Sequence, residues 1–251
     1  MRGSVKQQAH YEAIHDDYAQ HYYDASSMAF RNRFVYDPMF QDQDLNGKVV
    51  ADLACGSGHN SLAVLERFPH ARVMGFDVSA RACAAYRETV GREAVQVDLT
   101  AGADVGHQAD VAMVFGGLHH CVSDLEGTFR TIRRLVRPGG LLLMWEPNRQ
   151  CFLEGLRWLW YRLDRYFEST TEHALSEPGI RRLAAPGFEG LDCRYVGGPA
   201  YFLVCNSLVL RVPVGLKRGM ASPLFALESA YNRLPGRFWF PTFIARWRRT
   251  A

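Results

Sequence analysis

The sequence contains no apolar run long enough to cross a membrane. Its apolar stretches fall short of the roughly 18 consecutive residues that a spanning helix needs. The opening MRGSVKQQAHYEAIHDD also lacks the apolar core of a secretory signal peptide. From these two absences we expect a cytoplasmic protein, and contact with a membrane surface stays open as an alternative.

Excess charge and paired cysteines are also missing. The 29 basic residues against 26 acidic ones leave a net charge of +3, which is too mild to predict a nucleic-acid partner. The six cysteines are scattered, with neither a CxxC pair nor zinc-ligand spacing. We therefore expect free thiols, no disulfide framework and no metal site.

The pattern that is present predicts an α/β protein. The 251 residues are 48% hydrophobic and show no repeat or linker, so we expect residues 1–251 to form a single domain. Short apolar runs alternate with helical patterns, which is typical of βαβ units in a parallel sheet with helices on both faces. The expected strands are 49–53, 72–76, 94–97, 111–115 and 141–145, and the expected helices between them are 57–67, 80–90 and one that starts in a capping box of Ser123 and Glu126.

The flanks of this core have different patterns. Residues 1–45 predict a helical cap that lies across the carboxyl edge of the sheet, ahead of a cofactor-binding half at 46–150. Residues 151–251 form the substrate-side half with helical insertions. Its expected elements are an aromatic helix at 151–167, a strand at 187–196, a helix at 222–234 with Pro223 in first position, and a last strand from Thr242.

The stretch VVADLACGSGHNSLAVL, residues 49–65, predicts a strand, a glycine loop and the start of a helix. Gly56 and Gly58 leave room where side chains would otherwise stand, and the amino end of a helix attracts electron-rich groups. In a doubly wound sheet a ligand lies at the carboxyl ends of the strands, where the strand order reverses. The sequence therefore places a ligand over this loop.

Three acids specify that ligand. Asp77 closes the second strand, where a carboxylate can accept both hydroxyls of a ribose, and Asp98 closes the third, placed for the amine of an adenine. Asp52 would repel a pyrophosphate but suits a cationic amino group, and Ser61 replaces the third glycine of the dinucleotide motif. We favour S-adenosylmethionine over NAD. An NAD-dependent oxidoreductase and a non-catalytic cofactor-binding protein stay as alternatives.

These motifs resemble those of class I S-adenosylmethionine-dependent methyltransferases, the branch whose small members methylate metabolites, quinones and glycolipids. Residues 52–58 resemble the family's first motif, although Ala54 stands where many relatives have glycine. VFGGLHH (114–120) and LVRPGGLLLMWEPN (135–148) match the later segments. The resemblance implies a Rossmann-like, seven-stranded, mostly parallel sheet with an antiparallel last strand. It also implies a cofactor site made of Asp52, Ala54, Gly56, Gly58, Asp77, Val78, Asp98, Leu99 and Phe115.

The acceptor side carries the remaining candidates. We prefer His120 to His119 as the candidate for the base that activates an acceptor hydroxyl. In the alternative interpretation, His119 packs near the cofactor and His120 hydrogen-bonds the start of the next helix. Tyr18 matches the aromatic residue with which the family's leading helix covers the sulfonium, although core packing explains it equally well. Arg31 is a candidate for the cofactor carboxylate or for a surface ion pair. The candidates for contact with the acceptor are Tyr22, Glu146, Trp158 and Tyr201.

The sequence thus predicts methyl transfer to a small or lipid-linked, largely apolar acceptor, at a hydroxyl oxygen. Methylation at nitrogen or carbon of a natural product or quinone is the alternative. The absence of an Asn/Asp-Pro-Pro-aromatic tetrad in FGGLHH argues against the branch that methylates amino groups of nucleic acids. The aromatic and basic helix at 151–167 could line the acceptor pocket, rest on a membrane surface or pack in the core.

Overall fold

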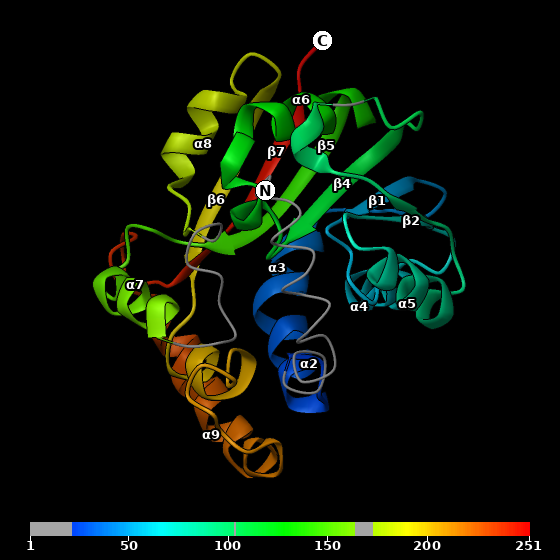
Figure 1. Ribbon diagram of the computed structural model, residues 1–251. Coiled ribbons are helices and arrows are strands. Elements are labelled where there is room, and N and C mark those ends of the chain that lie inside the picture. The colour runs from blue at the N-terminus through cyan, green and yellow to red at the C-terminus, as the bar shows by residue number, and fades with distance from the viewer. Residues whose placement is uncertain (1–21, 103, 164–172) are drawn as a thin grey trace.

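The computed structural model describes residues 22–102, 104–163 and 173–251 (Figure 1). A seven-stranded sheet with the order β3-β2-β1-β4-β5-β7-β6 runs through its centre. Six strands run in one direction and β7 runs against them, which confirms the predicted fold. The strands are β1 (Val49–Leu53), β2 (Arg72–Asp77), β3 (Ala94–Gln96), β4 (Ala109–Phe115), β5 (Val136–Pro147), β6 (Phe188–Val196) and β7 (Thr242–Arg249).

Helices cover both faces of the sheet because successive strand residues point to opposite sides. Val50 and its neighbours on one face pack against α4 (His59–Arg67), whereas Ala51 and its neighbours on the other pack against α6 (Leu125–Leu135) and α8 (Glu177–Ala184). Figure 1 shows these layers, with α5 (Ala80–Val90) beside α4. The strand order reverses between β1 and β4, so the predicted crevice lies at their carboxyl ends.

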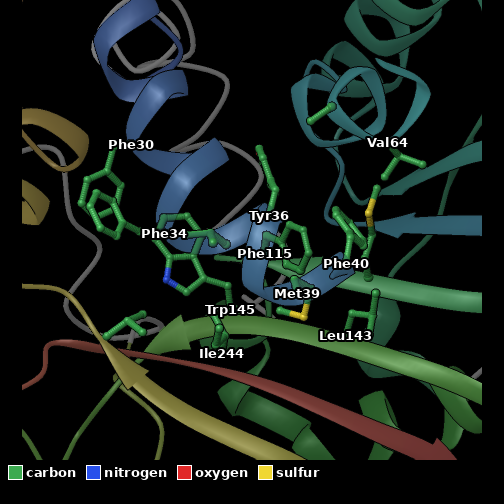
Figure 2. Close-up of a cluster of buried hydrophobic side chains, with 14 of the residues drawn as sticks. Phe30, Phe34, Tyr36, Met39, Phe40, Val64, Phe115, Leu143, Trp145 and Ile244 are labelled. Carbon is green, nitrogen blue, oxygen red and sulfur yellow. The ribbon is translucent and has the colours of Figure 1, made fainter. Parts of the chain in front are cut away.

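An N-terminal helical segment lies against the α4 side of the sheet. It consists of α2 (Ala25–Arg31), the π-helical η1 (Asn32–Tyr36) and α3 (Asp37–Phe40). Its aromatic residues point into one buried cluster with residues of β4, β5 and β7 (Figure 2). The labelled residues are Phe30, Phe34, Tyr36, Met39, Phe40, Val64, Phe115, Leu143, Trp145 and Ile244. This packing holds the segment across the sheet near the carboxyl ends of its strands.

Some element boundaries differ from the sequence prediction. Helix α4 begins at His59, because Gly58 is left-handed with φ 87°. The predicted capping box at Ser123 is wrong: the 3-10 turn η4 (Val122–Asp124) precedes α6, and Asp124 Oδ1 accepts a hydrogen bond from the Gly127 N–H at 2.7 Å. The third strand is one residue shorter than predicted, and the fifth runs from Val136 through the turn RPGG to Pro147.

The helices of the C-terminal half also start at other positions. Helix α9 spans Val214–Tyr231, so the prediction of a start at Pro223 is wrong, and that proline lies inside the helix. Helix α7 is described over Glu154–Leu163, later than the predicted start. The remaining short helices are η2 (Leu99–Ala101), η3 (Leu118–His120) and the π-helical η5 (Tyr201–Cys205). All six cysteines are free thiols. In the described part of the chain, no helix combines the length and apolarity needed to cross a membrane.

A buried ion pair joins α9 to the N-terminal segment. Lys217 of α9 is fully buried, and its Nζ lies 2.6 Å from Asp24 Oδ2 and 3.0 Å from Ser27 Oγ. Asp24 also caps α2 through the Ser26 and Ser27 N–H groups. Burial acts to raise the pKa of Asp24, but the hydrogen bonds and charge of Lys217 and Ser27 outweigh it and lower that pKa.

Substitution of Lys217 should therefore loosen the attachment of α9. Lys217→Met leaves the half-buried Asp24 carboxylate without its cation, so we expect the free energy of unfolding to fall by about 3 kcal/mol in urea denaturation. Lys48→Met, at an exposed position, is the matched control and should leave the midpoint within experimental error. Equal shifts for the two variants would contradict a stabilising role of the pair.

Candidate functional site

The first strand carries a fully buried carboxyl group near its end. Asp52 Oδ2 accepts a hydrogen bond from Ser61 Oγ at 2.8 Å, and Ser61 in turn accepts one from the Tyr86 hydroxyl at 2.8 Å. Asp52 Oδ1 is buried and has no hydrogen-bond partner among the described residues. Burial raises the pKa of Asp52 to about 8, opposed by the Ser61 hydrogen bonds and reinforced by the charge of Asp77. A buried oxygen that accepts no hydrogen bond destabilises the protein. A cationic ligand group that donates a hydrogen bond to it would remove this penalty.

The glycine loop after β1 leaves space at one glycine and closes it at the other. A Cβ atom on Gly56, whose φ is 53°, would meet nothing within 4 Å. A Cβ atom on Gly58 would lie 2.3 Å from Val90 Cγ2 and 2.7 Å from Tyr86 Cδ2. Gly56 thus keeps the front of the loop open, whereas the room at Gly58 is filled by α5. Ala54 is left-handed at φ 52°, a conformation that favours glycine.

The acids that close β2 and β3 border this loop. Asp77 Oδ2 accepts a hydrogen bond from the Gly56 N–H at 3.0 Å, and its Oδ1 accepts one from the Ser79 N–H at 2.9 Å. Asp98 follows β3 and caps η2, where its Oδ1 accepts hydrogen bonds from both the N–H and the hydroxyl of Thr100. An ionised carboxylate accepts about four hydrogen bonds, so these turns are compatible with binding a nucleoside.

The other predicted cofactor residues differ in exposure. Val78 is half-buried directly after Asp77, and Leu99 is buried in η2 directly after Asp98. Phe115 ends β4 as part of the core, with its ring centroid 5.9 Å from that of Tyr36. Val78 and Leu99 thus follow the two loop-bordering acids, while Phe115 lies beneath the N-terminal segment.

A second buried acid holds the loop after β4. Glu146 accepts hydrogen bonds from the N–H groups of Gly117 at 3.0 Å, Leu118 at 2.8 Å and His119 at 3.2 Å. His119 Nδ1 lies 2.8 Å from Glu146 Oε2. Burial raises the pKa of Glu146 to about 8 against these N–H groups. The structure thus gives Glu146 the task of positioning this loop.

The two histidines of that loop occupy different environments. Burial, with the charge of Arg157, lowers the pKa of His119 to about 3, so its imidazole is neutral. We assign the Nδ1–H as the donor to Glu146, since the three backbone N–H donors favour the carboxylate. His120 is half-buried, with its ring centroid 3.8 Å from that of His119. His120 is therefore the more accessible imidazole of the pair.

An arginine lies between two aromatic rings above the glycine loop. The Arg31 guanidinium lies 4.9 Å from the ring centroid of Tyr23 and 5.0 Å from that of Trp145, and the side chain is 4% exposed. Tyr23 stacks on His59, the first residue of α4, with the centroids 4.0 Å apart. No sequence pattern distinguishes Tyr23 from its neighbours, so the prediction missed it. The predicted Tyr18 lies outside the described residues.

Two of the predicted acceptor residues meet through a residue that the prediction missed. The Tyr22 hydroxyl donates a hydrogen bond to Asn206 Oδ1, and Asn206 Nδ2 donates one to the Tyr201 hydroxyl at 3.3 Å. The Tyr201 ring packs edge-on against Trp145 at 6.5 Å. The prediction missed Asn206 because it lies within the apolar run 201–210, which shows no pattern of a binding site. Trp158, by contrast, is 55% exposed on α7 and points outward.

Comparisons with known proteins identify methyltransferases as similar to part of this chain. Residues 50–140 match a family model described as a methyltransferase domain. A trans-aconitate 2-methyltransferase of Azoarcus sp. (strain BH72) is 34% identical over 101 residues, which are 39% of this chain and 39% of that protein. The match therefore spans well under half the length of this relative.

Solved structures share the fold over nearly the whole chain. A mycolic acid cyclopropane synthase in complex with S-adenosyl-L-homocysteine has a TM-score of 0.66 at 15% identity, covering 99% of this chain and 98% of that one. The N-methyltransferase NodS from Bradyrhizobium japonicum, also in complex with S-adenosyl-L-homocysteine, has a TM-score of 0.61 at 11% identity, covering 96% and 99%. These structures extend the likeness of fold beyond residues 50–140.

The two loop glycines should respond differently to substitution. Gly58→Ala drives a methyl group into Tyr86 and Val90, so we expect a loss of several kcal/mol of stability, about 3 or more, in thermal denaturation. Gly56→Ala adds a methyl group in open space and should cost about 1–2 kcal/mol through its left-handed backbone alone. A larger loss of stability for Gly56→Ala than for Gly58→Ala would contradict this account of the loop.

Proposed function

We propose that this chain, whose residues 50–140 match a methyltransferase domain, is a class I S-adenosylmethionine-dependent methyltransferase that transfers a methyl group to a small or lipid-linked, largely apolar acceptor at a hydroxyl oxygen. The observation that carries the proposal is the buried Asp52 Oδ1, which has no donor among the described residues and lies at the start of a loop with open space at Gly56. A carboxyl group in that position favours a ligand with a cationic amino group.

The residues around the loop fit S-adenosylmethionine. Asp52 would hold the amino group, and Asp77 would hold the ribose beside Gly56. Asp98 with Leu99 would border the adenine, and Arg31 would face the carboxylate of the amino-acid part. A dinucleotide fits less well, because its pyrophosphate would place negative charge near the Asp52 carboxyl group. The charges of these residues thus favour S-adenosylmethionine over a dinucleotide.

The chain's own residues supply orientation and a dry environment, since the methyl group of the bound sulfonium is already electrophilic. Glu146 fixes the loop that carries the two histidines, through three backbone hydrogen bonds. Tyr22, Tyr201 and Trp145 offer an aromatic surface for an apolar acceptor. His120 would take the proton of the acceptor hydroxyl as oxygen becomes the nucleophile. Methylation at nitrogen would need no such base to create the nucleophile, because the lone pair of a neutral amine is nucleophilic before any proton is removed.

Cofactor binding should release a proton from Asp52. The pKa of about 8 keeps this carboxyl group protonated at neutral pH, and an ammonium group beside Oδ1 would lower that pKa. Binding of S-adenosylhomocysteine should therefore release close to one proton, and affinity should rise with pH until about 8, where the carboxyl group is already ionised. Calorimetry in buffers of different ionisation enthalpy measures this release.

Two variants separate this effect from a general loss of binding. Asp52→Asn should weaken S-adenosylhomocysteine by at least about tenfold and abolish the proton release. Asp77→Asn should weaken binding but keep the release. Proton release that persists in Asp52→Asn, or tight binding of NADH by the unaltered protein, would overturn the assignment of the cofactor.

The role of His120 can be tested by turnover. His120→Gln should lower turnover by about 100-fold or more with a hydroxyl acceptor, because a general base contributes that much, while S-adenosylhomocysteine affinity stays unchanged. The assay follows S-adenosylhomocysteine formation with paired hydroxyl and amine acceptors of matched apolar bodies. Unchanged turnover on the hydroxyl acceptor would remove His120 as the base, and turnover on amines alone would assign the reaction to nitrogen.

A further inference from the structure

The exposed large apolar side chains of the described residues are not spread evenly. Eleven of these thirteen side chains lie on three segments, 152–159, 210–216 and 227–239. The other two, Leu183 and Leu191, lie on α8 and β6. Figure 1 shows α7 and α9, which belong to these segments, on the same side of the molecule, away from α4 and α5. A patch this concentrated marks an interaction surface.

Helix α9 buries two charged side chains next to Leu224 and Phe225, which pack against the apolar core. Its acidic residue Glu228 is fully buried and accepts hydrogen bonds from the N–H groups of Gly198 at 2.7 Å and Ala200 at 2.9 Å. Lys217, eleven residues earlier and thus on the same side of the helix, is buried against Asp24. Both of these charged side chains of α9 are therefore turned into the protein and paired there.

A second side of α9, about 100° round the helix from Lys217 and Glu228, is apolar and exposed. Leu216 is 54% exposed and Leu227 is 51% exposed, and their spacing of eleven residues places them in one row with Pro223 between them. Among the exposed residues of α9, all of which the structure describes, Arg218 alone carries a charge. A helix whose outer side faced only water would show the opposite pattern.

An aromatic cluster continues this surface beyond the end of α9. The rings of Phe152, Phe238 and Trp239 contact one another with centroids 5.2 to 5.9 Å apart, and all three side chains are more than 40% exposed. The Tyr231 hydroxyl at the end of α9 donates a hydrogen bond to the Trp239 carbonyl at 2.8 Å. We call Leu216, Pro223, Leu227 and this aromatic cluster the outer apolar face.

The exposed charges of residues 197–241, which carry most of the outer apolar face, have one sign. Residues 197–241 contain five basic residues and a single acid, Glu228. Since Glu228 and Lys217 are buried, the exposed charges of this stretch are arginines only: Arg211, Arg218, Arg233 and Arg237. Exposed apolar and aromatic side chains among cations, with no exposed acid in residues 197–241, complement the surface of an anionic bilayer.

We propose that the outer apolar face docks this protein onto a membrane surface that contains anionic lipids. In this arrangement α9 lies in the interfacial plane, with Leu216 and Leu227 among the acyl chains, the aromatic rings at the headgroup level, and the arginines on lipid phosphates. The attachment is peripheral. It stands on the surface of the protein alone and so is independent of the reaction that the active site performs.

Sedimentation of the full chain with lipid vesicles tests the proposal. We expect binding to vesicles of phosphatidylglycerol and phosphatidylcholine, binding at least about tenfold weaker to phosphatidylcholine alone, and loss of affinity as salt rises. The double variant Leu216→Glu/Leu227→Glu should lose at least about tenfold in vesicle affinity. Arg233→Glu should weaken binding to anionic vesicles and leave binding to neutral vesicles unchanged.

The chain offers matched controls elsewhere on its surface. Leu183→Glu/Leu191→Glu changes two leucines of similar exposure, and Arg182→Glu changes an exposed arginine of α8. These controls should bind vesicles as the unaltered protein does, and all variants should keep their S-adenosylhomocysteine affinity, which shows that they fold. Equal losses in test and control variants would overturn the proposal. So would a protein that ignores vesicles but forms dimers that Leu216→Glu/Leu227→Glu dissociates, because a second copy would then cover the face.

Discussion

The geometry of the site depends on one short chain of buried hydrogen bonds, from the Tyr86 hydroxyl to Ser61 and from Ser61 to Asp52. These donors hold one oxygen of the carboxyl group and leave the other without a donor in the described structure. These hydrogen bonds can form because α5 approaches the glycine loop closely. That approach is possible because residue 58 is a glycine, which has no side chain to block it. The packing of α5 against the glycine loop therefore determines which oxygen of Asp52 is left for a ligand.

Two buried acids at the same edge of the sheet have different tasks, and their hydrogen-bond donors distinguish them. Burial raises the pKa of Asp52 and of Glu146 to about 8. Glu146 accepts three backbone N–H groups and contacts His119, so both of its oxygens have hydrogen-bond partners within the protein. Asp52 has donors on one oxygen only. Burial alone thus does not indicate a binding group, whereas an unmatched acceptor beside open space does.

The core of the fold could be predicted from the sequence because each parallel strand is buried on both faces and so forms an uninterrupted apolar run. The acids that close β1, β2 and β3 could be placed for the same reason. The start of α9 could not, because Lys217 and Glu228 are buried while Leu216 and Leu227 are exposed, which obscures the apolar periodicity that identifies a helix. Tyr23 and Asn206 were missed because their positions depend on contacts between segments far apart in sequence.

The place of β7 in the sheet determines the order in which the sheet can be completed. Strand β6 hydrogen-bonds to β7 alone, and β7 separates it from β5. Residues 188–196 therefore have no sheet partner until the ribosome has released the segment around Thr242–Arg249. The strands β1 to β5 can pair with one another while synthesis continues, whereas β6 can join the sheet only after β7 has been made.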